Sequence, residues 1–198
     1  MLRTFIAVEL DSTLKQAISS VQESLKHELH GLAPGVRLQW VRVESIHLTL
    51  KFLGDIEEDG VADILHALEK VGHEYEPFSV EVKGFGVFPT LHAPRVLWVG
   101  LAGRTDRLIR LAECIEAALM PLGFHVEPKP YSPHLTLARV KEQSRTIGNA
   151  LADSGVMRDV TSRGTMPIRA MALMKSERTP SGSVYSRLGQ AMLGNAKV

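Results

Sequence analysis

The chain has 198 residues, a formal net charge of +1, and 44% hydrophobic and 23% charged residues. This composition is typical of a soluble globular protein with a full hydrophobic core, and no apolar run approaches the roughly 20 residues that span a bilayer. The near-neutral charge argues against extensive binding of duplex nucleic acid, and the single cysteine, Cys114, excludes an internal disulfide.

Helices and strands are predicted from the spacing of apolar residues, which recur every three or four positions in helices and cluster or alternate in strands. In chain order, we predict a strand at 2–10, a helix at 12–30, strands at 36–43 and 45–53, a helix at 57–72, a hairpin of strands at 78–88 and 95–101, a helix at 104–122, a strand at 133–140, a helix at 145–153, and strands at 166–176 and 183–192 joined by a turn at 179–182. The tail, residues 194–198, is predicted to fray.

One tetrapeptide occurs twice: residues 47–50 and residues 134–137 both read His-Leu-Thr-Leu. In a strand, side chains alternate between the two faces, so each His shares a face with its Thr while both Leu residues point into a core. Two such strands that face one cleft would offer an acid and a base, His47 and His134, to one substrate. The hydroxyls of Thr49 and Thr136 could hold its oxygens. The residues alone leave open which His is the acid.

The two halves of the chain resemble each other loosely. In each half, an apolar strand (FIAVEL or VLWVGL) precedes a long helix and then a His-Leu-Thr-Leu strand. We therefore predict an α+β fold built as a bilobal pseudo-twofold duplication, with antiparallel sheets that line a central cleft and helices on the outer faces. Residues 1–198 would form a single domain of two intertwined lobes.

Five further residues are candidates for substrate binding. Lys51 and Arg139 follow the motifs and could contact phosphate. Regular alternation places Lys51 on the His47 face and Arg139 on the opposite face, so Arg139 would need a twist or bulge to reach the site. Trp40, Tyr131 and Tyr185 could stack on a base or pack in the core. No cluster of His, Cys, Asp or Glu has metal-ligand spacing, so neither a metal nor another cofactor is expected.

The chain resembles the 2H phosphoesterase superfamily and, within it, the RNA 2′,3′-cyclic phosphodiesterase family, once called 2′-5′ RNA ligase. The resemblance rests on Phe-Ile-Ala-Val at 5–8, His-Leu-Thr-Leu-Lys-Phe-Leu-Gly at 47–54, Pro-Arg-Val-Leu-Trp-Val-Gly at 94–100, Ser-Pro-His-Leu-Thr-Leu-Ala-Arg at 132–139 and Gly-Ser-Val-Tyr at 182–185. It implies metal-independent hydrolysis of RNA 2′,3′-cyclic phosphate ends to 2′-phosphomonoesters. It also implies that His47 is the proton donor and His134 the proton acceptor.

The expected partners are RNA ends or short oligoribonucleotides with a 2′,3′-cyclic phosphate, and no membrane. The chain is expected to be a monomer. It is also expected to lie in the cytoplasm, since residues 1–14 are too acidic and too short in their apolar part for a secretory signal. Three alternatives stay open. The same residues could join RNA halves through a 2′-5′ bond. The fold could serve as a nucleotide- or RNA-binding module without turnover. The substrate could also be a small cyclic-phosphate metabolite.

Overall fold

The computed structural model describes residues 1–179 and 182–194, which contain nine strands and four α-helices. The strands are β1 (Leu2–Glu9), β2 (Leu38–Trp40), β3 (His47–Ile56), β4 (Phe78–Phe88), β5 (Val96–Gly103), β6 (His134–Val140), β7 (Ser162–Ile168), β8 (Ala170–Thr179) and β9 (Gly182–Met192). The helices are α1 (Ser12–Leu32), α2 (Gly60–Glu74), α3 (Thr105–Leu119) and α4 (Ser144–Ser154). The predicted turn residues 180–181 and tail residues 195–198 lie outside the described part.

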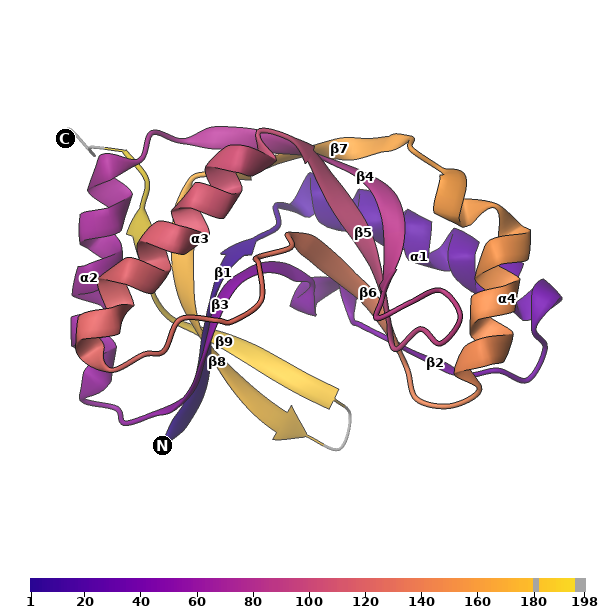
Figure 1. Cartoon of the computed structure of the whole chain (residues 1–198), viewed down its shortest axis with the longest axis horizontal. Coiled ribbons are helices and arrows are strands. Elements are labelled where there is room, and N and C mark those ends of the chain that lie inside the picture. The colour runs from indigo at the N-terminus through magenta and orange to yellow at the C-terminus, as the bar shows by residue number, and fades with distance from the viewer. Residues whose placement is uncertain (180–181, 195–198) are drawn as a thin grey trace.

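The strands form one curled antiparallel sheet in the order β7-β4-β5-β6-β3-β1-β8-β9, with β2 paired to β6 (Figure 1). The order is symmetric about its centre, where β3 and β6 meet. Outward from this centre, β1 corresponds to β5 and β8 corresponds to β4. The predicted α+β duplication is confirmed, because the strands FIAVEL and VLWVGL take equivalent places beside the two motif strands.

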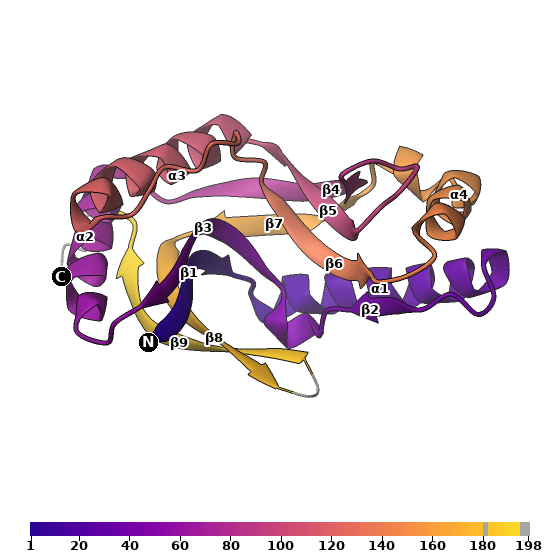
Figure 2. The ribbon, with the colours of Figure 1, turned by 60° about the horizontal axis from the view of Figure 1, so that its bottom comes forward.

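The helices cover the outer faces and cross between the halves of the sheet. Figures 1 and 2 show α2 with α3 at one end of the molecule and α1 with α4 at the other. Helix α1 follows β1 in sequence, yet it packs against β7 and α4, while α2 packs against β8 and β9. Two helices of the first half of the chain therefore cover strands of the second half.

Helix α1 illustrates how the sequence forms these elements. The Asp11 side chain accepts a hydrogen bond of 2.8 Å from the backbone N–H of Leu14 and so caps the first turn. The predicted apolar stripe is buried in the core, at Leu14, Ile18, Val21, Leu25 and Leu29. Burying such side chains contributes about 1.5–3 kcal/mol each, which makes this face the main source of helix stability.

Two predicted strands differ from the structure. The stretch predicted as one strand at 166–176 is divided between β7 and β8, which pair with β4 and β1 respectively. Its apolar alternation continues through the crossing, so periodicity could not reveal that the chain changes partners there. The strand predicted at 36–43 shrinks to β2, because residues Val43–Ser45 form a 3₁₀ turn before the first motif.

Within the described part of the chain, no helix is both long and apolar enough to cross a membrane.

Candidate active site

The two motif strands meet at the centre of the sheet. Strands β3 and β6 run antiparallel and pair at Leu48 and Leu135, both fully buried. Because side chains alternate along a strand, the neighbouring His and Thr residues point to the other face. There His47, Thr49, His134 and Thr136 line one cleft of about 780 Å³.

Both imidazoles are held in the same way. The Nδ1 atom of His47 lies 2.8 Å from the backbone oxygen of Ser45, and that of His134 lies 2.7 Å from the backbone oxygen of Ser132. A carbonyl oxygen only accepts, so each Nδ1 carries a hydrogen and donates it. This contact fixes the tautomer and leaves Nε2 of each ring as the atom that can exchange a proton with a substrate.

Aromatic rings surround each histidine. The ring of His47 lies 4.6 Å from that of Phe5 and edge-on to Tyr185 at 5.0 Å, between ring centres. His134 meets Phe88 edge-on at 5.0 Å and lies 6.0 Å from Trp98. These apolar neighbours exclude water from part of each imidazole and constrain its orientation.

Burial is the main cause that lowers the pKa of both histidines below the usual 6.5, because it disfavours the charged ring. The Arg139 guanidinium lowers the pKa of both further. The Ser45 and Ser132 carbonyls act in the opposite direction. Glu9, which pairs with His47 in the β1–β3 ladder, raises the pKa of His47 alone. The two rings are therefore alike in tautomer but differ in the charges that surround them.

A sequence model described as LigT-like phosphoesterase matches residues 8–98 and, separately, residues 99–185. The chain belongs to the LigT-like phosphoesterase family. Each match contains one His-Leu-Thr-Leu motif, so the duplication seen in the sheet is also present in the family pattern. The resemblance to 2H phosphoesterases stated from the sequence is confirmed.

Among similar proteins, one from Methanothermobacter thermautotrophicus named RNA 2′,3′-cyclic phosphodiesterase is 32% identical over 93% of this chain and 95% of its own length. One of the same name from Thermotoga maritima is 38% identical over 71% of each chain. A solved structure from Thermus thermophilus has a TM-score of 0.74 and 27% identity, and the match covers 98% of this chain and all of that one.

A bulge in each motif strand decides which side chains reach the cleft of this LigT-like phosphoesterase. Leu50 has no partner between the pairs Ile6–Lys51 and Ala7–Thr49, and Leu137 has none at the equivalent place in the β5–β6 ladder. An extra residue shifts the alternation by one position. Lys51 therefore turns into the core and Arg139 into the cleft. The face that regular alternation predicts is wrong for both residues, and Arg139 reaches the cleft through the bulge that it was expected to need.

Lys51 joins β3 to the segment that leads to the second motif. Its Nζ atom donates to Glu116 Oε2 at 2.6 Å and to the backbone oxygen of His125 at 2.8 Å, and its side chain is 1% exposed. Tyr131 lies in the same segment. Its hydroxyl donates to the backbone oxygen of Thr49 at 2.8 Å, and burial raises its pKa. Both residues lie outside the cleft lining and connect the two motifs to each other.

Replacing Lys51 with Ala should lower the free energy of unfolding by about 3 kcal/mol, because the Glu116 carboxylate would lose its partner in a largely buried place. Urea unfolding measures this. Lys26→Ala is the matched control, since Lys26 pairs with Glu23 at the same 2.6 Å on the surface, where such a pair contributes less than about 1 kcal/mol. Equal losses in the two variants would contradict a stabilising role for the buried pair.

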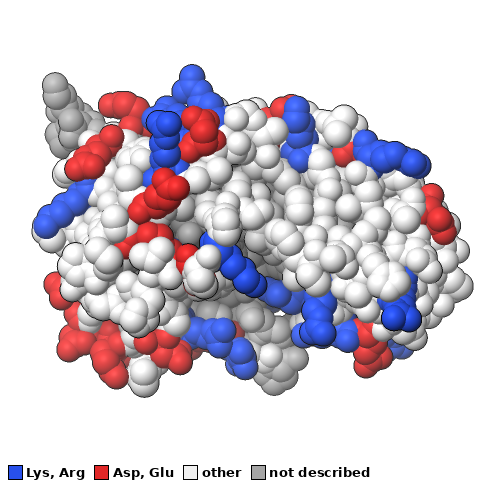
Figure 3. Space-filling view, in the orientation of Figure 1, with Lys and Arg blue, Asp and Glu red and all other residues white. Residues whose placement is uncertain are grey.

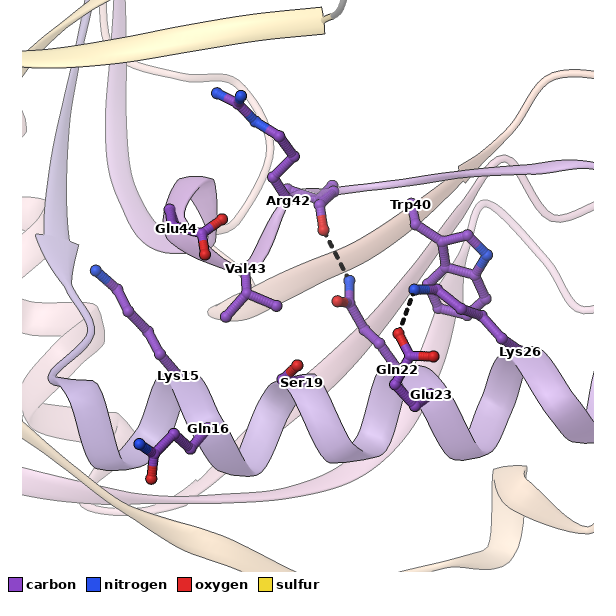
Figure 4. A pocket seen from close by; sticks show the side chains of 11 residues that line it. Lys15, Gln16, Ser19, Gln22, Glu23, Lys26, Trp40, Arg42, Val43 and Glu44 are labelled. Atoms are coloured by element: carbon purple, nitrogen blue, oxygen red, sulfur yellow. Dashed lines mark hydrogen bonds and ion pairs between the residues drawn. The ribbon is translucent and has the colours of Figure 1, made fainter.

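Two aromatic candidates are placed differently. Tyr185 lines the cleft beside His47. Trp40 lies in a separate depression between α1 and the following segment, where Lys26 Nζ lies 5.5 Å from the centre of its ring (Figure 4). Its neighbour Gln22 donates from Nε2 to the backbone oxygens of Val41 and Leu137, at 2.9 Å each, and so supports the β6 bulge from the core side.

Several residues that line the cleft or contact its histidines were missed from the sequence. Ser45 and Ser132 act through their backbone, but the repeat extends to them as Ser-x-His in both halves, and this signal could have identified them. Phe5 and Trp98 occupy the equivalent strands β1 and β5. Other missed lining residues include Phe52, 63% exposed at the cleft, and the cations Arg3, Lys141 and Arg178. Strand pairing brings these together, and spacing in the sequence gives no sign of it.

If one imidazole acts as a neutral base and the other as a charged acid, the kcat/KM of the free enzyme should show a bell-shaped pH profile. Its maximum should lie below pH 6.5, because both imidazoles have a lowered pKa. A bound phosphate anion favours the imidazolium, so the kcat maximum should lie at higher pH. Initial rates from pH 4.5 to 9 measure both. Arg139→Gln should move the kcat/KM maximum upward, and a wild-type maximum above pH 7 would contradict the assignment.

Proposed function

We propose that this chain hydrolyses RNA 2′,3′-cyclic phosphate ends to 2′-phosphomonoesters without a metal ion, with His47 and His134 as the acid and base. The observation that carries the proposal is the matched pair of imidazoles, each with Nδ1 fixed by a backbone carbonyl, in one cleft with two threonines. The activity named for the relatives from Methanothermobacter thermautotrophicus and Thermotoga maritima supports the same substrate class.

The reaction needs one proton removed and one supplied. The neutral Nε2 of His134 takes a proton from water, whose oxygen attacks phosphorus. The bond between phosphorus and the 3′ oxygen breaks, and the protonated Nε2 of His47 donates its hydrogen to that oxygen. The products are a 2′-phosphomonoester and a 3′ hydroxyl. Proton exchange with solvent returns both rings to their starting states.

The division of roles between the two rings follows what the family resemblance implies. Burial and Arg139 lower the pKa of both rings. Glu9 raises the pKa of His47 and so favours the charged form that an acid requires, whereas His134 lowers it. The Glu9 carboxylate is the carboxylate that distinguishes the surroundings of His47 from those of His134.

The remaining groups stabilise charge on the phosphate. In the described part of the chain, neither Thr49 nor Thr136 has a side-chain hydrogen bond, so both hydroxyls are available to donate to the non-bridging oxygens. Arg139 neutralises part of the negative charge. The two imidazoles supply both proton transfers of the scheme, and no group of three His, Cys, Asp or Glu side chains in the described residues could hold a metal.

The test is incubation of an oligoribonucleotide that ends in a 2′,3′-cyclic phosphate, with EDTA present, followed by identification of the product. We expect a 2′-phosphomonoester at an undiminished rate. Loss of activity in EDTA that a divalent ion restores would overturn the metal-independent scheme. A 3′-phosphomonoester would show that the 2′ oxygen leaves instead.

A further inference from the structure

The cleft is far more basic than the chain as a whole. The net charge is +1, yet four cations line the cleft: Arg3, Arg139, Lys141 and Arg178. None of the described residues that line it is Asp or Glu. Figure 3 shows Lys and Arg side chains along the hollow across the middle of the molecule. The positive charge is therefore concentrated where the substrate would bind.

These four cations have no ion-pair partner within the described residues, whereas several cations on the same or adjoining strands do. On β8, Lys175 pairs with Glu177 at 3.0 Å, while Ser176 and Arg178, at the alternate positions, line the cleft. On β9, Arg187 pairs with Glu9 at 3.0 Å. The carboxylates thus neutralise cations outside the cleft and leave those inside it available to an anion.

One cation suffices at the reacting group. A 2′,3′-cyclic phosphate carries a single negative charge, and Arg139 is the cation whose field reaches both His47 and His134. Arg139 lies on the motif strand β6, whereas Arg3 and Arg178 lie on other strands. They come from the adjacent strands β1 and β8, where the pair Thr4–Lys175 sets the register, and they line the same wall of the cleft.

We propose that Arg3 and Arg178 form a second phosphate subsite, which binds the phosphodiester on the 5′ side of the terminal nucleotide. This inference rests on the proposed function and specifies its substrate: an RNA end of at least two nucleotides rather than a small cyclic-phosphate metabolite. Guanidinium groups suit such a site, because they donate in pairs to phosphate oxygens. The remaining cation, Lys141, lies two residues beyond Arg139 at the end of β6.

The test compares three substrates: a nucleoside 2′,3′-cyclic phosphate, a dinucleotide that ends in the same group, and that dinucleotide with an uncharged methylphosphonate linkage. For the wild type, kcat/KM should be roughly tenfold higher for the natural dinucleotide than for the other two, since only it offers a second charge. The fall of log kcat/KM with log salt should also be steeper for it, by about 0.7 per phosphate contact.

Arg3→Gln and Arg178→Gln should each remove most of this preference and change the rate with the mononucleotide less than about twofold. Lys175→Gln is the matched control, because it removes one charge from β8 outside the cleft. It should leave kcat/KM unchanged for both the dinucleotide and the mononucleotide. Equal losses on all substrates, or a preference that disappears only in Lys141→Gln, would overturn the subsite.

Failure of the proposed function would give a different result, namely no hydrolysis of any of the three substrates. The subsite is then judged from binding of the dinucleotide with a 2′-phosphate end. Its affinity should exceed that of its methylphosphonate counterpart, and the excess should be lost in Arg178→Gln. Equal affinities would overturn the inference independently of catalysis.

Discussion

Replacing His47 or His134 with Ala should each lower kcat/KM by about 10²–10⁴-fold, because each imidazole carries one of the two proton transfers in the proposed mechanism. The double variant should be little worse than either single one, since residues that act as a unit are not additive. Steady-state kinetics with a cyclic-phosphate dinucleotide measure these losses.

The control for the histidine variants is His66→Ala, on an exposed part of α2, which should leave kcat/KM unchanged. The melting temperatures of all these variants should stay close to that of the wild type. Both motif rings lie in the cleft rather than in the buried core. If His47→Ala unfolded most of the protein but left the folded fraction fully active, His47 would be a structural residue.

Replacing Thr49 or Thr136 with Ala should lower kcat by about 10–10³-fold, since in the proposed mechanism each change removes one donor to the phosphoryl oxygens. The loss should fall mainly on kcat, because charge on these oxygens develops as the water attacks.

The serine variants are the matched controls for the threonines. Thr49→Ser and Thr136→Ser keep the hydroxyl and lose only a methyl group, so most of the activity should remain. If the Ser variants lost as much as the Ala variants, the methyl groups and their packing would matter, and the hydroxyls would not be the stabilising groups.

Much of this fold could be predicted because its determinants are local. The apolar stripe of α1 and the repeated tetrapeptide depend on spacing within a few residues. In both cases this spacing alone identifies the face of the helix or strand that is buried. The repeat also predicted that two strands would bring His47 and His134 to one cleft. That inference needed only side-chain alternation and the symmetry of the two halves.

The predictions that were wrong depended on pairing between distant segments. Regular alternation places Lys51 on the His47 face, but the bulge at Leu50 reverses it, and the matching bulge at Leu137 brings Arg139 to the cleft. A bulge is a property of two strands together, so a single strand's sequence does not show it. The crossing from β7 to β8 was missed for the same reason.

The positive charge of the cleft also could not be predicted from the sequence, because it depends on pairing between distant strands. A net charge of +1 suggests few contacts with phosphate, but it averages over paired and unpaired groups. Arg3, Arg139 and Arg178 lie on three different strands, and only the sheet brings them together. The distribution of charge, rather than its sum, is what a polyanionic substrate would meet.

The division of roles between the two histidines is tested most directly with a dinucleotide whose cyclic phosphate has sulfur in place of the 3′ oxygen. A thiolate leaves without protonation far more readily than an alkoxide, so the acid becomes unnecessary while the base is still needed. We expect His47→Ala to recover most of its lost rate with this substrate and His134→Ala to recover none. Recovery by His134→Ala instead, or by neither variant, would contradict His47 as the proton donor.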